Sequence, residues 1–189
     1  MNEEKIDLRV IKTKRNIYQA LLSLMKDHIF EDIKVSQICD KAMINRSTFY
    51  AHFDDKYSLF KSFIEDLEST LKVELSKNKN ILSSKEYYIE LIRLLITHFE
   101  KERDVYTALI QNNRNSIAMD MIHDALREDV FSHVKKEELV GKKIPIEFTL
   151  NFYLGAIFYV GMEWITNNEK YTKEEIIEYL NLLIPNEVI

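Results

Sequence analysis

The sequence predicts an all-α protein, and three observations support this fold class. The 189-residue chain contains only 3 Gly and 2 Pro, which are the residues that interrupt helices. Apolar residues recur at spacings of three and four over most of the chain, as in amphipathic helices. Two short helical segments meet in a tight turn at Met43–Ile44. We therefore expect a three-helix helix-turn-helix unit over residues 1–56 and a larger helical unit over residues 57–189.

The individual helices follow from apolar stripes and from the breakers between them. Polar or Gly/Pro-containing runs at 78–84, 112–115 and 141–145 separate the later segments. Val10, Ile17, Leu21 and Leu24 mark the core face of the first helix, and Asp55 is a favourable cap for the fourth. The expected helices are about 8–28, 35–42, 45–53, 56–76, 85–100, 103–111, 116–139, 146–166 and 173–184.

The net charge of −5 is unevenly distributed along the chain. Residues 1–56 hold 10 Lys and Arg against 9 Asp and Glu, a net charge of +1, whereas residues 57–189 hold 16 against 22, a net charge of −6. The acidity therefore belongs to the larger unit. It does not exclude nucleic-acid binding by the N-terminal unit, because only the docked face has to match the phosphates.

Composition and the chain ends predict a cytoplasmic protein without a membrane segment. Residues 1–5 are polar and charged after the initial Met and lack the apolar core of a signal peptide. The single cysteine, Cys39, lies on an apolar helix face and fits a reducing compartment. Phe148–Met162 is 15 residues without a charge, which is short of the ~20 residues of a membrane span.

Residues 45–56 carry the chemistry of a DNA-reading helix. Phe49 and Phe53 are four apart and face the small core, with Asn45 as a favourable N-cap. This leaves a basic residue, two small hydroxyls, a phenol and an imidazole on the other faces, namely Arg46, Ser47, Thr48, Tyr50 and His52. Such side chains donate to phosphates and reach base edges in a major groove.

These residues resemble the TetR family of bacterial transcription regulators. The resemblance is carried by Thr13-Lys14, Val35-x-x-Ile38-Cys39, Ala42-x-Ile44-Asn45, Thr48-Phe49-Tyr50-x-His52-Phe53 and Asp55-Lys56-x-x-Leu59. Beyond residue 86, Tyr87-Tyr88, Arg103-Asp-x-Tyr106-x-x-Leu109 and the helix leading to Trp164 are similar to one type of TetR ligand and dimer domain. The resemblance implies a dimeric DNA-binding regulator.

The family implies phosphate contacts by Tyr50, His52 and Lys56, and the chemistry of these side chains agrees. The first turn of the helix would reach base edges, where Arg46 reads guanine or pairs with a phosphate; the sequence leaves both open. Each position has the alternative of a solvated surface residue. The full set of expected DNA-binding residues is Thr13, Lys14, Ser36, Gln37, Asn45, Arg46, Ser47, Thr48, Tyr50, His52 and Lys56.

Two positions depart from the family pattern. Met43 stands where the family turn usually has Gly, and a non-Gly residue in a left-handed turn is strained. The turn is therefore open to another geometry. Lys34 stands where the second helix usually opens with a Thr cap, so we expect the cap to be supplied differently, for example by Ser36.

The resemblance also implies a pocket in the larger unit, where a ligand changes the spacing of the two recognition helices. The candidates are aromatic and Met side chains, for each of which plain core packing is the alternative. They are Tyr88, Phe99, Tyr106, Met119, Tyr153 and Phe158.

The helix 146–166 is apolar on most sides and needs cover all round. One domain covers one side, and a second copy of the chain is the simplest cover for the other. We therefore expect a homodimer through this helix and the last one, with Phe152, Gly155, Ala156, Tyr159, Ile177 and Leu180 at the interface.

The expected function is that of a ligand-released repressor binding a palindromic operator, with an unidentified small molecule as effector and no cofactor. The alternative is a coactivator-type family member acting through a protein partner. Asp120, His123 and Asp124 are also compatible with a metal site, although a solvated face with Arg127 fits them better. No Gly-rich phosphate loop, Cys-x-x-Cys motif or catalytic Ser/His/Asp set stands out, so we expect no enzyme activity.

Overall fold

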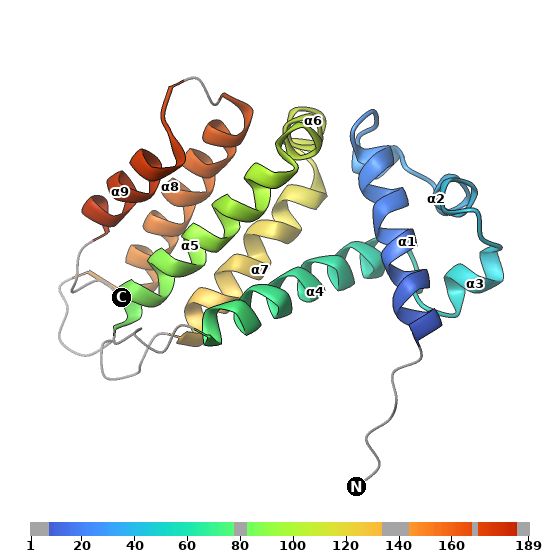
Figure 1. Ribbon diagram of the computed structural model, residues 1–189, viewed down its shortest axis with the longest axis horizontal. Helices are drawn as coiled ribbons and strands as arrows, with labels where there is room; N and C mark the ends of the chain where they lie inside the picture. The colour runs from blue at the N-terminus through green and yellow to red at the C-terminus, as the bar shows by residue number, and fades with distance from the viewer. Residues whose placement is uncertain (1–7, 78–82, 134–143, 168–169, 185–189) are drawn as a thin grey trace, which may run out of the picture.

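The computed structural model describes residues 8–77, 83–133, 144–167 and 170–184, and within these ranges the regular structure is helical (Figure 1). This confirms the all-α class. The elements are α1 (Leu8–Met25), the short 3-10 turn η1 (Phe30–Asp32), α2 (Val35–Ala42), α3 (Arg46–Tyr50), α4 (Lys56–Ser76), α5 (Ser84–Lys101), α6 (Arg103–Asn113), α7 (Ile117–His133), α8 (Ile146–Thr166) and α9 (Lys173–Leu183).

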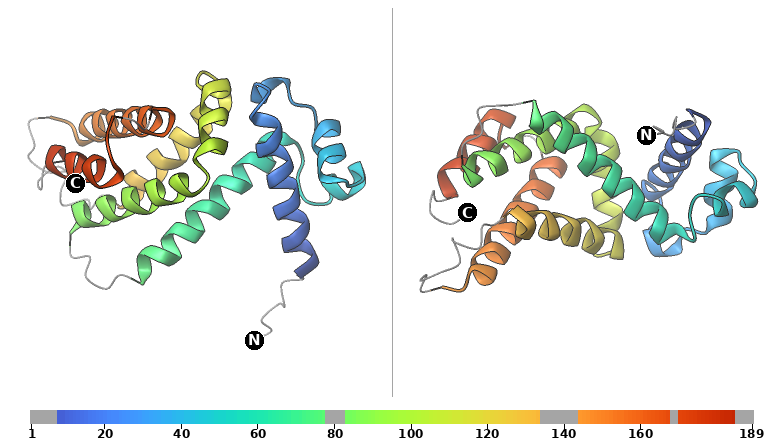
Figure 2. Two further views of the ribbon diagram at one scale, coloured as in Figure 1. Left: turned by 45° about the horizontal axis from the view of Figure 1, so that its top comes forward. Right: turned by 90° about the horizontal axis from the view of Figure 1, so that it is seen from below.

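Helices α1–α3 form a small unit at one end of the molecule, and α5–α9 form a larger helical unit at the other (Figures 1 and 2). Helix α4 runs from the first unit along the second, and α6 packs against both α1 and α8. Helices α4 and α6 contact α1 directly, and α7 contacts η1. Within the described ranges, no helix combines the length and the apolar character that a membrane span requires.

Several helices begin where the sequence supplies a matched capping pair. At α4, Asp55 Oδ1 accepts from the Ser58 amide at 2.7 Å, and the Asp55 amide donates to Ser58 Oγ at 3.0 Å. Ser83 with Glu86 at α5 and Thr172 with Glu175 at α9 repeat this arrangement. Such pairs satisfy amides that have no partner within the helix.

Most expected helix boundaries agree with the structure, including those of α4 and α8. Helix α1 ends at Met25 instead of His28, and regular α3 ends at Tyr50 instead of Phe53. Helix α6 continues through Asn113, into the run expected to be a loop. The expected extension of α7 to residue 139 lies outside the described residues.

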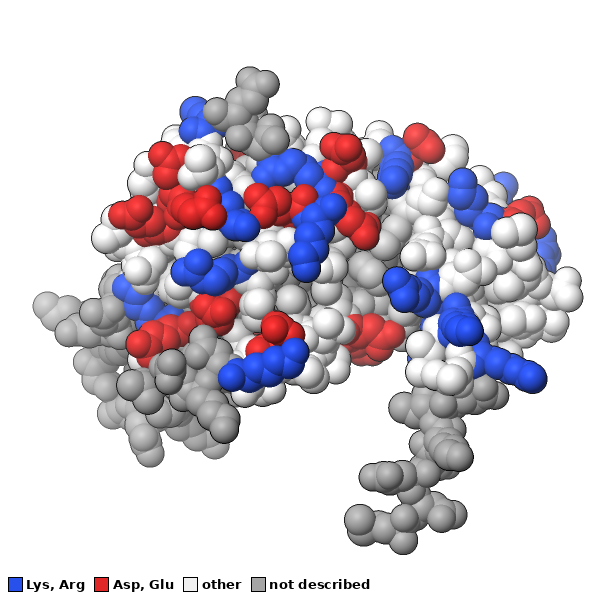
Figure 3. All heavy atoms as spheres, viewed as in Figure 1, with Lys and Arg blue, Asp and Glu red and all other residues white. Residues whose placement is uncertain are grey.

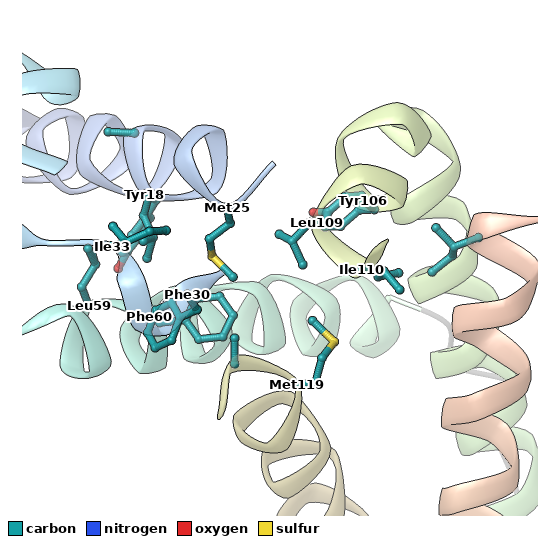
Figure 4. Packing of buried hydrophobic residues seen from close by; sticks show 14 of the residues in the cluster. Tyr18, Met25, Phe30, Ile33, Leu59, Phe60, Tyr106, Leu109, Ile110 and Met119 are labelled. Atoms are coloured by element: carbon teal, nitrogen blue, oxygen red, sulfur yellow. The ribbon is translucent and has the colours of Figure 1, made fainter. Parts of the chain in front are cut away.

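A single apolar cluster links the small unit to the larger one. Phe30 and Phe60 are fully buried side by side, and Met119 of α7 belongs to the same cluster (Figure 4). Cys39 is buried, as expected. Val10 was expected in the core but is 37% exposed, because the first turns of α1 extend past the helices that cover Ile17 and Leu21. The core therefore begins about two turns into α1.

The turn between α2 and α3 keeps the left-handed geometry even though the position is not Gly. Met43 has φ 53° and ψ 45° and is 89% exposed. Of the two geometries that the sequence left open, the turn has the left-handed one. The carbonyls of Cys39 and Asp40 accept from the Ile44 and Met43 amides at 3.0 and 3.2 Å, and this closure holds the strained residue in place.

We expect Met43→Gly to raise the free energy of unfolding by about 1 kcal/mol, because Gly adopts a left-handed conformation without the Cβ clash. The Met43 side chain is almost fully exposed, so its loss removes little packing. Met43→Ala is the matched control, since it shortens the side chain but keeps the Cβ. Urea denaturation measures all three proteins, and an equal gain in both variants would refute strain as the cause.

Candidate nucleic-acid interface and internal cavity

Helix α3 rests on two buried rings and presents its polar residues to solvent. Phe49 and Phe53 are buried with their ring centroids 5.8 Å apart. Arg46, Ser47 and Tyr50 are exposed, whereas Thr48 is half-buried. The Tyr50 ring stands edge-on to Phe49 at 5.4 Å, which leaves 56% of the residue exposed. The sequence pattern thus produces a polar, convex face on a fixed apolar base.

The starts of α2 and α3 differ from the expected capping. Asn45 occupies the N-cap of α3, but its side chain makes no capping bond. At α2, Gln37 Oε1 accepts from the Lys34 amide at 2.8 Å, so Gln37 rather than Ser36 closes this helix start. The side-chain nitrogen of Gln37, Nε2, keeps its two N–H groups for other partners.

The contact residues expected on α1 lie beside the recognition unit. Thr13 and Lys14 are half-buried, and Lys14 Nζ lies 5.8 Å from the Phe53 ring centroid. Asn16 Nδ2 donates to Ala42 O at 2.7 Å, which ties α1 to the end of α2. His52 is half-buried in the turn after α3, with its amide donating to Phe49 O at 2.9 Å.

The structure gives Lys56 a different role from the expected phosphate contact. Its ammonium donates to the carbonyls of Phe30 and Ile33, both at 2.9 Å, and to that of Glu31 at 2.5 Å. It also lies 5.1 Å from the Phe30 ring centroid. All three N–H groups are thus used within the protein. Lys56 holds η1 against the start of α4 instead of facing outward.

Charge is distributed unevenly over the visible face of the molecule. In Figure 3, Lys and Arg predominate over the part formed by α1–α3, while Asp and Glu are mixed with Lys and Arg over the larger unit. This agrees with the separate charge sums of the two halves of the sequence. The exposed basic residues near α3 include Arg9, Lys12, Arg15, Lys41 and Arg46.

The larger half of the molecule contains a cavity of about 230 Å³ that is lined by all six helices from α4 to α9. All six expected pocket residues line it, together with side chains of α4, α5 and the single Trp164. The lining is almost entirely aliphatic and aromatic. Tyr88 donates through its hydroxyl to Val130 O at 2.9 Å, and the Phe99 and Tyr106 ring centroids are 4.7 Å apart. The arrangement suits an apolar guest.

Two polar groups interrupt the apolar wall. The Tyr106 hydroxyl lies 2.7 Å from His98 Nε2. Burial, with a smaller contribution from Glu102, raises the pKa of Tyr106 to about 12. Burial also lowers the pKa of His98. At another part of the wall, Lys72 Nζ contacts Glu68 and lies 2.9 Å from Asp129 Oδ1. The hydrogen bond that Lys72 donates to Glu68 is the largest influence that raises the pKa of Lys72.

Only some of the residues expected at the dimer interface lie on the surface of the protomer. Phe152 and Tyr159 are 63% and 57% exposed, Ala156 is exposed, and a Cβ built on Gly155 meets no heavy atom within 4 Å. These residues form an outward stripe on α8. Ile177 and Leu180, however, are buried and belong to the protomer core. The exposed apolar residues of α9 are Tyr179, Leu182 and Leu183.

The acidic residues around His123 form no described metal site. The His123 ring stands edge-on to Phe158 at 5.5 Å, and its Nδ1 lies 3.8 Å from Asp124 Oδ1. Among the described residues, no group of three His, Cys, Asp or Glu side chains is arranged to hold a metal ion.

Sequence reasoning missed the polar residues that join the two units. Asn113 was assigned to a loop, yet it is 1% exposed and bonded to four backbone groups of the chain. Glu31 accepts from the Ile117 amide at 2.6 Å. No local pattern marks either residue. Three of the four partners of Asn113 are 83 to 88 residues away, and the partner of Glu31 is 86 residues away.

A helix-turn-helix unit with an exposed polar recognition helix, joined to a helical unit around an apolar cavity, defines a DNA-binding transcription regulator. Residues 17–63 match the family described as bacterial regulatory proteins of the tetR family, and residues 86–186 match a transcriptional regulator C-terminal region of the same family. The chain therefore belongs to the TetR family of transcription regulators.

Solved structures and a curated relative agree with this assignment. A TetR regulator from Streptococcus agalactiae is 25% identical, with a TM-score of 0.66 over 96% of this chain and 98% of that one. FadR from Bacillus subtilis, solved with stearoyl-CoA, is 15% identical with a TM-score of 0.63 over 89% and 96% of the two chains. The uncharacterized regulator YxbF of Bacillus subtilis is 34% identical over 55 residues, which are 29% of this chain and 14% of that protein.

Proposed function

We propose that this regulator is a homodimeric repressor that binds a palindromic operator through α3 and is released by a small apolar ligand. The observation that carries the proposal is the exposed polar face of α3 on its buried Phe49–Phe53 base. A helix fixed in this way enters a major groove without reorganisation. The proposed division assigns DNA binding to residues 1–56 and ligand binding with dimerisation to residues 57–189.

In the proposed complex, Arg46, Ser47 and Thr48 face base edges, because they form the first turn of α3. Tyr50 and His52 donate to phosphates on one side of the groove, and Thr13, Lys14, Ser36 and Gln37 contribute backbone contacts around it. Asn45 starts the helix at the DNA surface. Lys56 is left out of the contact set, because its ammonium is committed to η1.

The cavity supports a ligand that is mostly hydrocarbon. Its wall consists of aliphatic and aromatic side chains, and the polar exceptions are the Tyr106 hydroxyl and the side chains of Glu68, Lys72 and Asp129. FadR from Bacillus subtilis, which has a similar fold, was solved in complex with stearoyl-CoA, a long-chain acyl compound. That complex is consistent with a ligand of this kind here. Burial of apolar surface provides the affinity, and the few polar groups orient the ligand.

The outward stripe on α8 supports an isologous dimer. Phe148, Phe152, Ala156 and Tyr159 recur at spacings of three and four and are exposed in the single protomer. The open space at Gly155 allows a second helix to approach closely. The side chains of Tyr179, Leu182 and Leu183 extend the apolar surface along α9. A two-fold contact of α8 and α9 with their copies buries this surface.

We expect Phe152→Glu to shift the protein from dimer to monomer at micromolar concentration, because it places two carboxylates near the two-fold axis. Sedimentation velocity measures the change. Val73→Glu is the matched control: Val73 is 58% exposed but lies on α4, away from the stripe. If both variants remain dimeric, the α8 stripe is not the interface.

The DNA-binding proposal is tested by selection from random-sequence duplexes with the purified chain. We expect enrichment of an inverted repeat whose half-sites suit recognition helices about 34 Å apart. Enrichment of a single unrepeated site would contradict the dimeric docking. Absence of any enrichment would favour the alternative, in which the chain acts through a protein partner.

A further inference from the structure

The short turn η1 is bonded from the cavity side by α6. Asn113, the last residue of α6, accepts from the Phe30 amide through Oδ1 at 2.7 Å and donates to Met25 O through Nδ2 at 3.0 Å. The same Nδ2 donates to Leu109 O, one turn back in α6, at 3.0 Å. One buried side chain therefore joins the end of α6, the end of α1 and the start of η1.

Helix α7 is attached to the same turn by a second bond. Glu31, in the middle of η1, accepts from the amide of Ile117, the first residue of α7, at 2.6 Å. Asn112 adds a further bond to Lys26 O in the turn that precedes η1. Both ends of the α6–α7 connection are thus fixed to η1 or to the turn before it.

The opposite side of η1 is attached to the start of α4. Lys56 donates to the carbonyls of Phe30 and Glu31 in the turn and of Ile33 directly after it. Lys56 is the first residue of α4, and α3 ends only six residues before it, at Tyr50. A displacement of η1 therefore changes the position of α3 through a short, capped connection.

Apolar contacts connect the same elements to the cavity. Leu109 and Ile110 of α6 and Met119 of α7 line the cavity and belong to the cluster that contains Phe30 (Figure 4). Leu109 lies one turn before Asn113, and Met119 lies two residues after Ile117. A guest that displaces this wall necessarily displaces the groups bonded to η1, because close-packed side chains transmit strain.

We propose that η1 is the junction through which occupancy of the cavity sets the position of the recognition helix, with Asn113 and Glu31 as its positioning residues. The inference rests on the proposed ligand-released DNA binding. Its physical basis is a continuous set of short hydrogen bonds and packed side chains between two sites, which can move as a unit. Removing either of these two side chains should abolish the coupling between the cavity and the recognition helix and leave both sites intact.

A cavity-filling substitution replaces the unidentified ligand in the test. Gly161 lines the cavity, and a Cβ built on it meets no heavy atom within 4 Å, so Gly161→Leu introduces apolar volume without a clash at Cβ. Glu31→Ala removes the hydrogen bond between η1 and the Ile117 amide of α7. Glu31 is exposed, so we expect the protein to tolerate this substitution. Glu31→Gln is the matched control, since it keeps the oxygen that accepts from Ile117. Affinity is measured for a duplex selected by the wild-type chain, and thermal unfolding verifies that each variant folds.

We expect Gly161→Leu to weaken duplex binding by about fivefold or more in the wild-type and Glu31→Gln backgrounds, which is the lower end of typical allosteric coupling. In the Glu31→Ala background the effect should fall below about twofold. An equal effect in all three backgrounds would overturn the junction, and so would no effect in the wild type. Asn113→Ala repeats the test from the α6 side. If the wild type selects no duplex, the proposed function fails, which is a distinct result.

Discussion

Replacing Lys56 by Met is expected to lower the free energy of unfolding by about 3 kcal/mol, because three carbonyls lose a charged donor at about 1 kcal/mol each. Burial lowers the pKa of Lys56, while Glu31, Asp32 and Asp55 act in the opposite direction, which agrees with an ammonium held inside a carbonyl cradle. Met retains the apolar stem, so packing changes little. Urea denaturation followed by circular dichroism measures the loss.

The matched control is Lys61→Met on the same helix. The Lys61 side chain is 71% exposed, and its Nζ lies 3.9 Å from Glu65, so its removal should cost less than about 0.5 kcal/mol. If Lys56→Met is as mild as Lys61→Met but abolishes DNA binding, Lys56 is a phosphate contact after all and its assigned role at η1 is wrong.

Replacing Tyr50 by Ala is expected to weaken operator binding about thirtyfold with little change in stability. Each protomer loses about 1 kcal/mol from one phosphate hydrogen bond and its ring contact, so the dimer loses about 2 kcal/mol. Since about 1.4 kcal/mol corresponds to a factor of ten, this loss is about thirtyfold. The residue is more than half exposed and packs only edge-on against Phe49. Fluorescence anisotropy with a selected duplex measures the affinity.

Tyr50→Phe separates the hydroxyl from the ring and should produce a smaller loss. Because phosphate contacts carry no sequence information, both variants should weaken matched and mismatched duplexes alike. Thr48→Val should instead change the preference at one or two base pairs. Unchanged affinity of Tyr50→Ala at moderate salt would contradict the proposed docking.

Much of the fold could be predicted from the sequence, because the information was local. The extent of α8 follows from a long, mostly apolar run after Pro145, and the start of α4 follows from the cap residue Asp55, which the structure pairs with Ser58. The burial of Phe49 and Phe53 follows from their spacing. The six pocket candidates share one cavity because aromatic and Met residues on facing helices meet inside such a unit.

The remaining features depend on partners that are distant in the sequence. Ile177 and Leu180 were assigned to the dimer surface because periodicity identifies an apolar face without saying what covers it. The structure covers that face within the protomer. Lys56 was expected to contact a phosphate, and its bonds within the protein could not be foreseen because the carbonyls that it contacts are 23 to 26 residues earlier in the chain. Met43 shows that a strained turn survives when the helices on both sides fix it.

The central claim is that the chain binds DNA specifically as a dimer through α3, and one measurement tests it most directly. Equilibrium binding to a selected duplex and to a scrambled duplex of equal length is recorded across a salt series. We expect a clear preference for the selected duplex, saturation at two chains per site, and an affinity that falls steeply as salt rises. Weak, equal binding to both duplexes at every salt concentration would contradict the account.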